Sequence, residues 1–495
     1  MIQRLFIIIL LLDLFYTSTL FAKNEDSKKA GKQNGNLVSS ILLLELAGEI
    51  DQSVIDTYSA CYNALKTKDY SATFADVSAS SEVQAVVKKH NIHHLGGPML
   101  GVVSSEGARV WLRTVRPASV EVHITVKGEN RIFGPVESTN ESDLVAIVPV
   151  TGLGPNTSHP YAVFVDGYEI TIPGFAVIPT SPVIGKPSKV RITFGTCFHR
   201  WGLSNQAQAD TLIKRKPNAL LVYGDIAVQD RYNLLSMHRA DYLLRDFHKA
   251  WQTMACTVPT YAAWDDHDYF ANDKSGIPEG YKLKDKQGVC DVFTSSWNNP
   301  SNGFNDERRG IFFHTQIGPC DVIMLDNRYF RVGEKKNPKE FLGKEQTAWL
   351  KQELLACKGA FIIISCGTMW SDYVSNGKDS WGVWDPNGRE ELFQFIEKNH
   401  IGGVMFISGD RHGARGFTIP RPNGFKFYEF EAASMGGRSG APSGDNPFYL
   451  LKGQYAFGEF SIDATLEDPK VTFRLVRDTG EIHHEMTLSR SQLTP

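Results

Sequence analysis

Residues 219–225 read Ala-Leu-Leu-Val-Tyr-Gly-Asp, five apolar residues in succession followed by a glycine and an aspartate. A short, continuously apolar run is typical of a strand that is covered on both faces. Four further runs rich in apolar residues span residues 190–194, 322–325, 361–364 and 404–407. We therefore expect a sheet with both faces buried, whose strands come from widely separated parts of the chain.

Amphipathic stretches separate these runs. In two of them, side chains recur at the spacing of one helical face. The first set is Leu234, Met237, Leu244, Phe247 and Trp251, and the second is Gln346, Trp349, Leu350 and Leu354. Buried strands that alternate with helices predict a layered α/β domain over residues 186–495.

The pattern upstream is different. Residues 119–126 alternate between polar and apolar side chains, which indicates a half-buried strand, and residues 109–113 and 161–165 add further strands. Several short strands within about ninety residues favour a small β-sandwich of the immunoglobulin or fibronectin kind, which we place at residues 93–185. The proline-rich stretch at residues 179–187 has the composition of a linker.

The N-terminus has the features of a targeting segment. Arg4 precedes an apolar run over residues 5–12, and Ala22 precedes a polar stretch. This pattern predicts a signal peptide at residues 1–22, hence export to a periplasmic or extracellular location. Asp13 interrupts the apolar segment, which argues against stable membrane insertion after export. Residues 23–92 carry no chemical motif and predict a helical or irregular N-terminal segment.

Charge and cysteine content limit the function classes further. The 495 residues include 52 Lys and Arg against 55 Asp and Glu, a formal net charge of −3, and no basic block stands out. Specific nucleic-acid binding is therefore not expected. Export would permit disulfides, but the seven cysteines are an odd number, so at least one stays unpaired.

Polar residues follow the predicted strands directly, where α/β sheets commonly build their sites. The four segments are Phe194-Gly195-Thr196-Cys197-Phe198-His199, Tyr223-Gly224-Asp225, Trp264-Asp265-Asp266-His267-Asp268 with Asn272 shortly after, and Ser408-Gly409-Asp410-Arg411-His412. Carboxylates held this close repel one another unless a cation or water surrounds them. The apolar residues 261–264 directly before this segment argue against exposure of its carboxylates to water.

This donor set suits the hydrolysis of phosphate esters. Two or more cations held by shared carboxylates neutralise the phosphate oxygens and lower the pKa of bound water to about 7. Carboxylate and amide oxygens favour calcium or manganese, whereas thiolate and imidazole favour iron or zinc. Each residue alone has a simpler explanation: Asp225 could cap a helix, and Cys197 could be a buried thiol or half of a disulfide.

Together, the four segments resemble the PhoD-like (alkaline phosphatase D) branch of the calcineurin-like metallophosphoesterases, in which Cys replaces the usual first Asp. Residues 297–301, 325–331 and 342–346 resemble the same family, and the likeness extends over residues 97–495. It implies an αββα metallophosphoesterase domain behind the β-sandwich. It also implies a metal-dependent hydrolase that acts on small phosphate mono- or diesters.

The resemblance assigns roles residue by residue. Its implied metal ligands are Cys197, Asp225, Asp265 or Asp266, Asn272, Asp410 and His412. Iron or zinc is implied near Cys197 and His412, and calcium or manganese at the Asp and Asn positions. His267 occupies the place of the histidine that contacts phosphate and assists the leaving group, and His199 is an additional candidate ligand.

One position departs from the family pattern. PhoD-like proteins often carry an iron-binding tyrosine three residues after the aspartate of the second segment, where this chain has Val228. This difference bears on the iron assignment more than on phosphoesterase activity. Val228 therefore leaves open the alternative that the protein is catalytically degenerate and binds metal or another ligand on the same fold. A serine esterase is disfavoured because the chain lacks a Gly-x-Ser-x-Gly segment.

Overall fold

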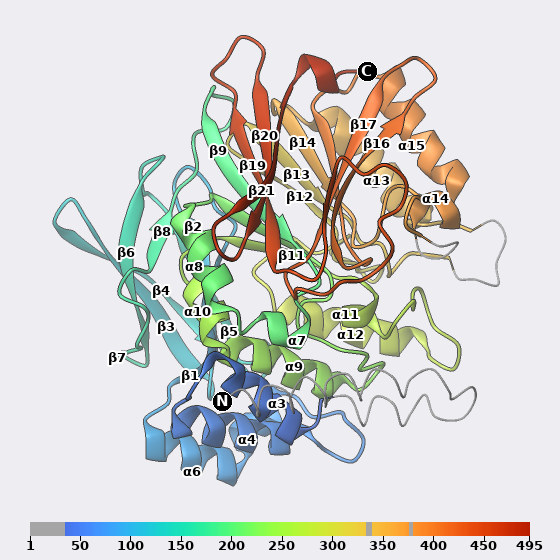
Figure 1. Ribbon diagram of the computed structural model, residues 1–495. Helices are drawn as coiled ribbons and strands as arrows, with labels where there is room; N and C mark the ends of the chain where they lie inside the picture. Colours follow the sequence, from blue (N-terminus) through green and yellow to red (C-terminus); the bar gives the residue numbers. More distant parts are fainter. Residues whose placement is uncertain (1–34, 333–338, 376–379) are drawn as a thin grey trace.

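The computed structural model describes residues 35–332, 339–375 and 380–495 (Figure 1). The predicted signal peptide lies outside them. In the predicted N-terminal segment, the described residues 35–92 form four α-helices, α3 (Leu37–Leu44), α4 (Gln52–Leu65), α5 (Phe74–Ala79) and α6 (Ser81–His90). Buried side chains of α4, among them Tyr58 and Leu65, share a core with Leu243 and Leu244 further along the chain. These helices therefore pack on the larger domain.

Two antiparallel sheets follow. One has the order β1-β2-β5 and the other β4-β3-β6-β7, with β8 paired to β6. Their strands are β1 (His94–Gly101), β2 (Ala108–Thr114), β3 (Ala118–Val126), β4 (Glu129–Ser138), β5 (Val145–Val150), β6 (Ser158–Val165), β7 (Tyr168–Glu169) and β8 (Val177–Pro179). Val110 of the first sheet and Val122 of the second belong to one buried cluster, so the two sheets share a core. The strands predicted at residues 109–113, 119–126 and 161–165 are confirmed.

The larger domain contains two mixed sheets. The six-stranded sheet is ordered β11 (Thr260–Ala263), β10 (Ala219–Tyr223), β9 (Lys189–Gly195), β19 (Ala456–Asp463), β20 (Lys470–Arg477) and β21 (Ile482–Ser489). The seven-stranded sheet is ordered β12 (Phe313–Ile317), β13 (Cys320–Met324), β14 (Phe361–Ser365), β15 (Val404–Ser408), β17 (Lys426–Ala433), β16 (Gly413–Pro420) and β18 (Tyr449–Leu451). All five predicted apolar runs form strands.

Helices cover the outer faces of both sheets, as Figure 1 shows for α13 and α15. The helices described in this domain are α7 (His199–Gly202), α8 (Gln206–Lys214), α9 (Leu235–Phe247), α10 (Lys249–Ala255), α11 (Asp266–Tyr269), α12 (Leu283–Ser295), α13 (Gly343–Ala356), α14 (Trp381–Trp384) and α15 (Pro386–Lys398). One buried cluster joins Phe194 and Phe460 to Ile363 and Phe430 between the sheets. Leu350 of α13 packs with Ile364 on the outer face. The layered α/β architecture is confirmed.

One predicted helix is interrupted. Leu234, Met237, Leu244, Phe247 and Trp251 fit a single helical face, but the structure divides the segment into α9 and α10 at His248. The backbone of His248 is extended, at φ −71° and ψ 120°. Its ring is buried and lies 3.0 Å from the Ser204 hydroxyl. The helix thus ends where His248 contacts a distant segment, and the local periodicity of the sequence does not reveal this end.

Candidate metal centre

The polar segments that follow β9, β10, β11 and β15 converge. Cys197, His199, Asp225 and His412 each offer one ligand atom, and all four atoms lie within 4.8 Å of one another. The Cys197 thiol donates to Asp225 Oδ2 at 3.4 Å, and the His199 and His412 rings approach at 3.5 Å. His199 therefore joins the three ligands that the sequence suggested for this group.

Carboxylates dominate the neighbouring groups. Asp265, Asp266 and Asp410 offer oxygens within 4.8 Å of one another, and Asp225, Asp266 and His267 form a further such set. Asp225 thus belongs both to the group that contains sulfur and nitrogen and to one rich in oxygen. A carboxylate in that position can bridge two cations.

The buried carboxylates fit a cation chemically. Asp225 Oδ1 is buried and has no hydrogen-bond partner. Burial raises the pKa of Asp225 well above its ordinary value, and neighbouring carboxylates add to that rise, whereas His267 opposes it. Several buried carboxyl groups cannot all ionise side by side without positive charge between them. The donor set therefore fits the cluster of metal ions that the sequence predicts.

Backbone conformation sets these side chains apart. Cys197, His199, Asp225, Asp410 and His412 all have positive φ, between 49° and 68°. Residues other than glycine rarely adopt this region, at a cost of about 1–3 kcal/mol each, and such residues cluster at functional sites. A concentration of such residues at the strand ends agrees with this cluster as the candidate site.

His267 lies beside the cluster, and its Nδ1 is 2.7 Å from Asp230 Oδ1. Burial lowers the pKa of His267, but neighbouring carboxylates, Asp230 foremost, outweigh that effect and hold the pKa well above its ordinary value. Asp230 therefore orients the ring through one nitrogen and favours its charged form. A histidine in this state can contact phosphate and donate a proton.

Comparison with known proteins agrees with this geometry. A family model described as "PhoD-like phosphatase" matches residues 222–492, more than half of the chain. The chain belongs to the PhoD-like phosphatase family. It is therefore a metal-dependent phosphoesterase, as the sequence motifs predicted. A second model, "Domain of unknown function (DUF7800)", matches residues 93–182.

Two solved structures share the fold at low sequence identity. One is described as "Structure of PhoD": TM-score 0.67, 15% identity, 81% of this chain and 92% of that chain covered. The other is the purple acid phosphatase PPD1 from yellow lupin (Lupinus luteus) seeds: TM-score 0.58, 15% identity, 79% of this chain and 74% of that chain covered. No curated protein matches the chain in sequence. These likenesses confirm the metallophosphoesterase fold.

Asp268 of this PhoD-like phosphatase holds two segments of the site together. Its carboxylate accepts the backbone N–H groups of Asp225 at 2.5 Å, Ile226 at 3.0 Å and Asp265 at 3.3 Å. The side chain is buried, so these bonds fix the turn after β10 against the start of α11. Gly224 completes the contact, because a Cβ at this position would lie 2.4 Å from that of Asp265.

The two aspartates of the third segment have different surroundings. Asp265 Oδ1 accepts from Arg328 Nε and, at 2.7 Å, from Asn327 Nδ2. Asp266 accepts the backbone N–H groups of His267 at 2.9 Å and of Asp273 at 2.6 Å. Arg328 is fully buried, so its pairing with Asp265 is an interior ion pair.

Asn272, the remaining predicted ligand, is exposed. Its side-chain amide donates to Asp273 at 2.8 Å, and its backbone N–H donates to Asp230 at 2.9 Å. The structure thus places Asn272 at the edge of the His267 environment, and its role as a ligand remains a prediction.

Arg438 is a contact that the sequence motifs did not reveal. Its Nη1 lies 2.9 Å from His412 Nε2 and 3.4 Å from His199 Nε2. The residue stands in the loop Gly436-Gly437-Arg438-Ser439-Gly440. A Cβ at Gly440 would lie 2.3 Å from that of His412, so this loop needs glycine to approach the site. The sequence feature that could have indicated this contact is an arginine flanked by glycines.

Val228, at the position of the family tyrosine, is fully buried in the core. Tyr232 stacks on Tyr281, with ring centroids 6.3 Å apart, and the Tyr269 hydroxyl donates to the Gly276 carbonyl. The Tyr269 hydroxyl is therefore engaged elsewhere, whereas the contact of Tyr232 involves only its ring. His199 is the additional side chain that the structure supplies to this group.

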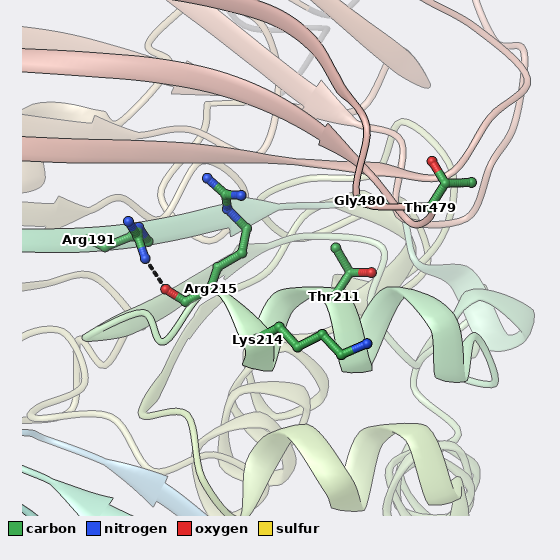
Figure 2. Close-up of a pocket in the computed structure, with 6 residues that line it drawn as sticks. All are labelled: Arg191, Thr211, Lys214, Arg215, Thr479 and Gly480. Carbon is green, nitrogen blue, oxygen red and sulfur yellow. Dashed lines mark hydrogen bonds between the residues drawn. The ribbon is translucent and has the colours of Figure 1, made fainter.

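A pocket of about 320 Å³ lies away from the strand ends that carry the cluster. Figure 2 shows Arg191 donating to the Arg215 carbonyl, with Lys214, Thr211, Thr479 and Gly480 around the same hollow. Arg191 is near the start of β9, whereas Cys197 follows the end of that strand. Glu459 pairs with Arg215, so part of the positive charge is already neutralised. The pocket is not the phosphoesterase site.

Proposed function

We propose that this PhoD-like phosphatase hydrolyses small phosphate mono- or diesters at the cluster of Asp225, His267 and their neighbours. One cation would be held by Cys197, His199, Asp225 and His412. A second would be held by Asp265, Asp266 and Asp410, with Asp225, which lies beside Asp266, and Asn272 as further candidate ligands. The observation that carries this proposal is that Asp225 belongs to the first group and also lies with Asp266 in another group of ligand atoms, which links the two positions.

Donor chemistry supports different metals at the two positions. The first group offers a thiol and two imidazoles beside one carboxylate, which favours iron or zinc. The second offers carboxylate oxygens, which favour calcium or manganese. When bound, such cations would neutralise phosphate oxygens and lower the pKa of water.

The protein's own side chains supply the remaining roles. His267, charged and oriented by Asp230, donates a proton to the leaving-group oxygen. Arg438, which reaches His412 and His199, provides a guanidinium for the phosphate oxygens. Asp268 keeps Asp225 and Asp265 in register through their backbone N–H groups.

The other parts of the chain have separate proposed roles. Residues 93–185 are proposed to form an immunoglobulin- or fibronectin-like domain, which the core shared by their two sheets supports. The sequence pattern of residues 1–22 is the sole basis on which we propose export. Within the described ranges, no helix has the length and apolarity needed to cross a membrane.

Two substitutions test the ligand sets. Asp225→Ala should remove both cations, whereas His412→Ala should remove the one in the sulfur- and nitrogen-containing group, and both should abolish hydrolysis. Metal content by mass spectrometry and turnover of a chromogenic phosphate ester are the measurements. Asp210→Asn, which alters an exposed carboxylate on α8, is the control. Near-normal turnover with metal retained would remove either residue from the site, and metal binding without hydrolysis in the parent would favour the degenerate alternative.

A further inference from the structure

A second group of metal-binding side chains lies outside the phosphoesterase site. His314 on β12, Asp321 on β13 and Cys357 at the end of α13 offer a nitrogen, an oxygen and a sulfur within 4.8 Å of one another. Asp321 stands near the start of β13, which runs parallel to β14 and β15. Asp410 follows the far end of β15, so the two groups lie at opposite ends of this sheet.

Asp321 is held with one oxygen turned toward the group. Its Oδ2 accepts the backbone N–H groups of Lys358 at 3.1 Å and Gly359 at 2.6 Å. Its Oδ1 lies 2.8 Å from His314 Nε2. The side chain is only 2% exposed, so its position is fixed by the protein and not by solvent.

His314 is oriented by a second carboxylate. Its Nδ1 lies 2.7 Å from Glu353 Oε2, one helical turn before Cys357 on α13. A metal-bound histidine almost always donates its other ring N–H to a carboxylate, carbonyl or water, which fixes the tautomer. Glu353 is placed to do this, because Nε2 is the nitrogen that faces Asp321 and Cys357.

Cys357 completes the group from the helix end. Its Sγ lies 3.9 Å from His314 Nε2, and its backbone N–H donates to the Glu353 carbonyl at 2.9 Å. The carbonyl groups at a helix C-terminus carry partial negative charge, which favours a cation there. Two carboxylates, a thiol and a helix end therefore surround one imidazole.

The separations are close to those of a coordination shell. Ligand atoms around a tetrahedral zinc lie roughly 3.2–3.8 Å apart, as bond lengths of about 2.0–2.3 Å require. The 3.9 Å between Cys357 Sγ and His314 Nε2 already approaches this range, and the 2.8 Å between His314 Nε2 and Asp321 Oδ1 must open by about half an ångström. Because Asp321 is held in place, the 19% exposed His314 side chain would make that change.

We propose that His314, Asp321 and Cys357 bind a divalent transition-metal ion, zinc by donor type, with Glu353 orienting His314 and water at the fourth position. The ion would tie the β12–β13 hairpin to the C-terminal end of α13, far from the phosphoesterase site. The competing explanation is an ion triad, in which a protonated His314 bridges Asp321 and Glu353 and no metal binds.

Metal analysis of the full chain in a Cys197→Ser background separates the two explanations, because that change removes the thiol of the phosphoesterase site. We expect this protein to take up cobalt(II) with a thiolate-to-cobalt absorption band. Adding Cys357→Ser should abolish the band and lower bound zinc by one equivalent. Glu345→Gln, which alters an exposed carboxylate on the same helix, should leave both unchanged.

Two outcomes overturn the proposal: no thiolate band in the Cys197→Ser protein, or a band and zinc content that persist after Cys357→Ser. Glu353→Gln gives a second test if the cysteine variant does not fold. It keeps all three ligands, so the band should persist while zinc affinity falls about 10- to 100-fold. Affinity equal to that of Glu345→Gln would contradict the assigned role of Glu353. Neither outcome depends on phosphoesterase activity.

Discussion

Nδ1 of His267 lies 2.7 Å from Oδ1 of Asp230, and the carboxylate also accepts the backbone N–H of Asn272 at 2.9 Å. The pair combines a residue of α11 and one from the loop after β10, thirty-seven positions apart in the chain. Because Asp230 engages one ring nitrogen, it sets both the orientation and the charge of His267.

Asp230→Asn should therefore lower turnover without loss of metal. Loss of a proton-transfer group costs about 10²–10⁴-fold in rate. We expect the loss of turnover in His267→Ala to fall in that range and the loss in Asp230→Asn to be smaller. The asparagine also removes the charge that raises the His267 pKa, so the decline of activity at high pH should move to lower pH. Metal content and the pH profile of kcat are measured together. Loss of a full metal equivalent in His267→Ala would make His267 a ligand.

His199 should count as a ligand in metal analysis. We expect His199→Ala to lose the metal of the thiol-containing group while the oxygen-rich group keeps its own, because His199 belongs to the first set of ligand atoms and not to the second. His248→Ala, which alters a buried histidine bonded to Ser204, serves as the control for folding. Equal metal content in the two variants would exclude His199 from the shell.

Because residue 228 is a valine, we can predict the visible absorption of the iron-loaded protein. Tyrosinate bound to ferric iron absorbs visible light, but valine supplies no such ligand, and the Tyr269 hydroxyl donates to the Gly276 carbonyl. We expect no tyrosinate-to-iron band in the metal-replete protein. Any band that arises from the Cys197 thiolate should vanish in Cys197→Ser. A band that survives this change but is lost in Tyr232→Phe or Tyr269→Phe would show that a tyrosine reaches the metal.

Asp268→Asn should destabilise the fold. The three backbone N–H groups of Asp225, Ile226 and Asp265 donate to the two carboxylate oxygens. Asparagine replaces one of these oxygens with an NH₂ group, which would face at least one of the N–H donors. A buried donor left unsatisfied costs about 1–3 kcal/mol. Urea unfolding after chelation measures the change, with Asp210→Asn as the exposed counterpart. A free energy of unfolding equal to that of the control would show that these hydrogen bonds do not hold the turn.

Metal affinity at the thiol-containing group should weaken as pH falls. Burial raises the pKa of the Cys197 thiol well above its ordinary value, and the charges of Asp225 and Asp410 raise it further. A metal ligand must be thiolate, so binding releases a proton and competes with protonation. Zinc titrations at pH 6 and pH 8 should give the weaker affinity at pH 6. The same affinity at both values would mean that Cys197 does not bind the ion as a thiolate.

The sequence was sufficient for the elements and the chemistry. Short apolar runs such as residues 219–223 and 404–407 became buried strands, because continuous apolarity has few other stable arrangements in a chain of this size. The polar residues after them identified Cys197, Asp225 and His412, since ligand types and strand ends are both local properties. Family membership followed from the same segments in the same order.

Only the tertiary structure decided which side chains complete the site. Whether His199 faces the cluster depends on its positive φ and on its approach to His412, 213 positions away. Arg438 reaches the same histidines from a loop whose sequence carries no metal-binding pattern. The break at His248 and the burial of Arg328 beside Asp265 likewise depend on partners distant in the chain. Periodicity and motifs record the local preferences of a segment, whereas these contacts exist only after strands from both sheets have brought their ends together.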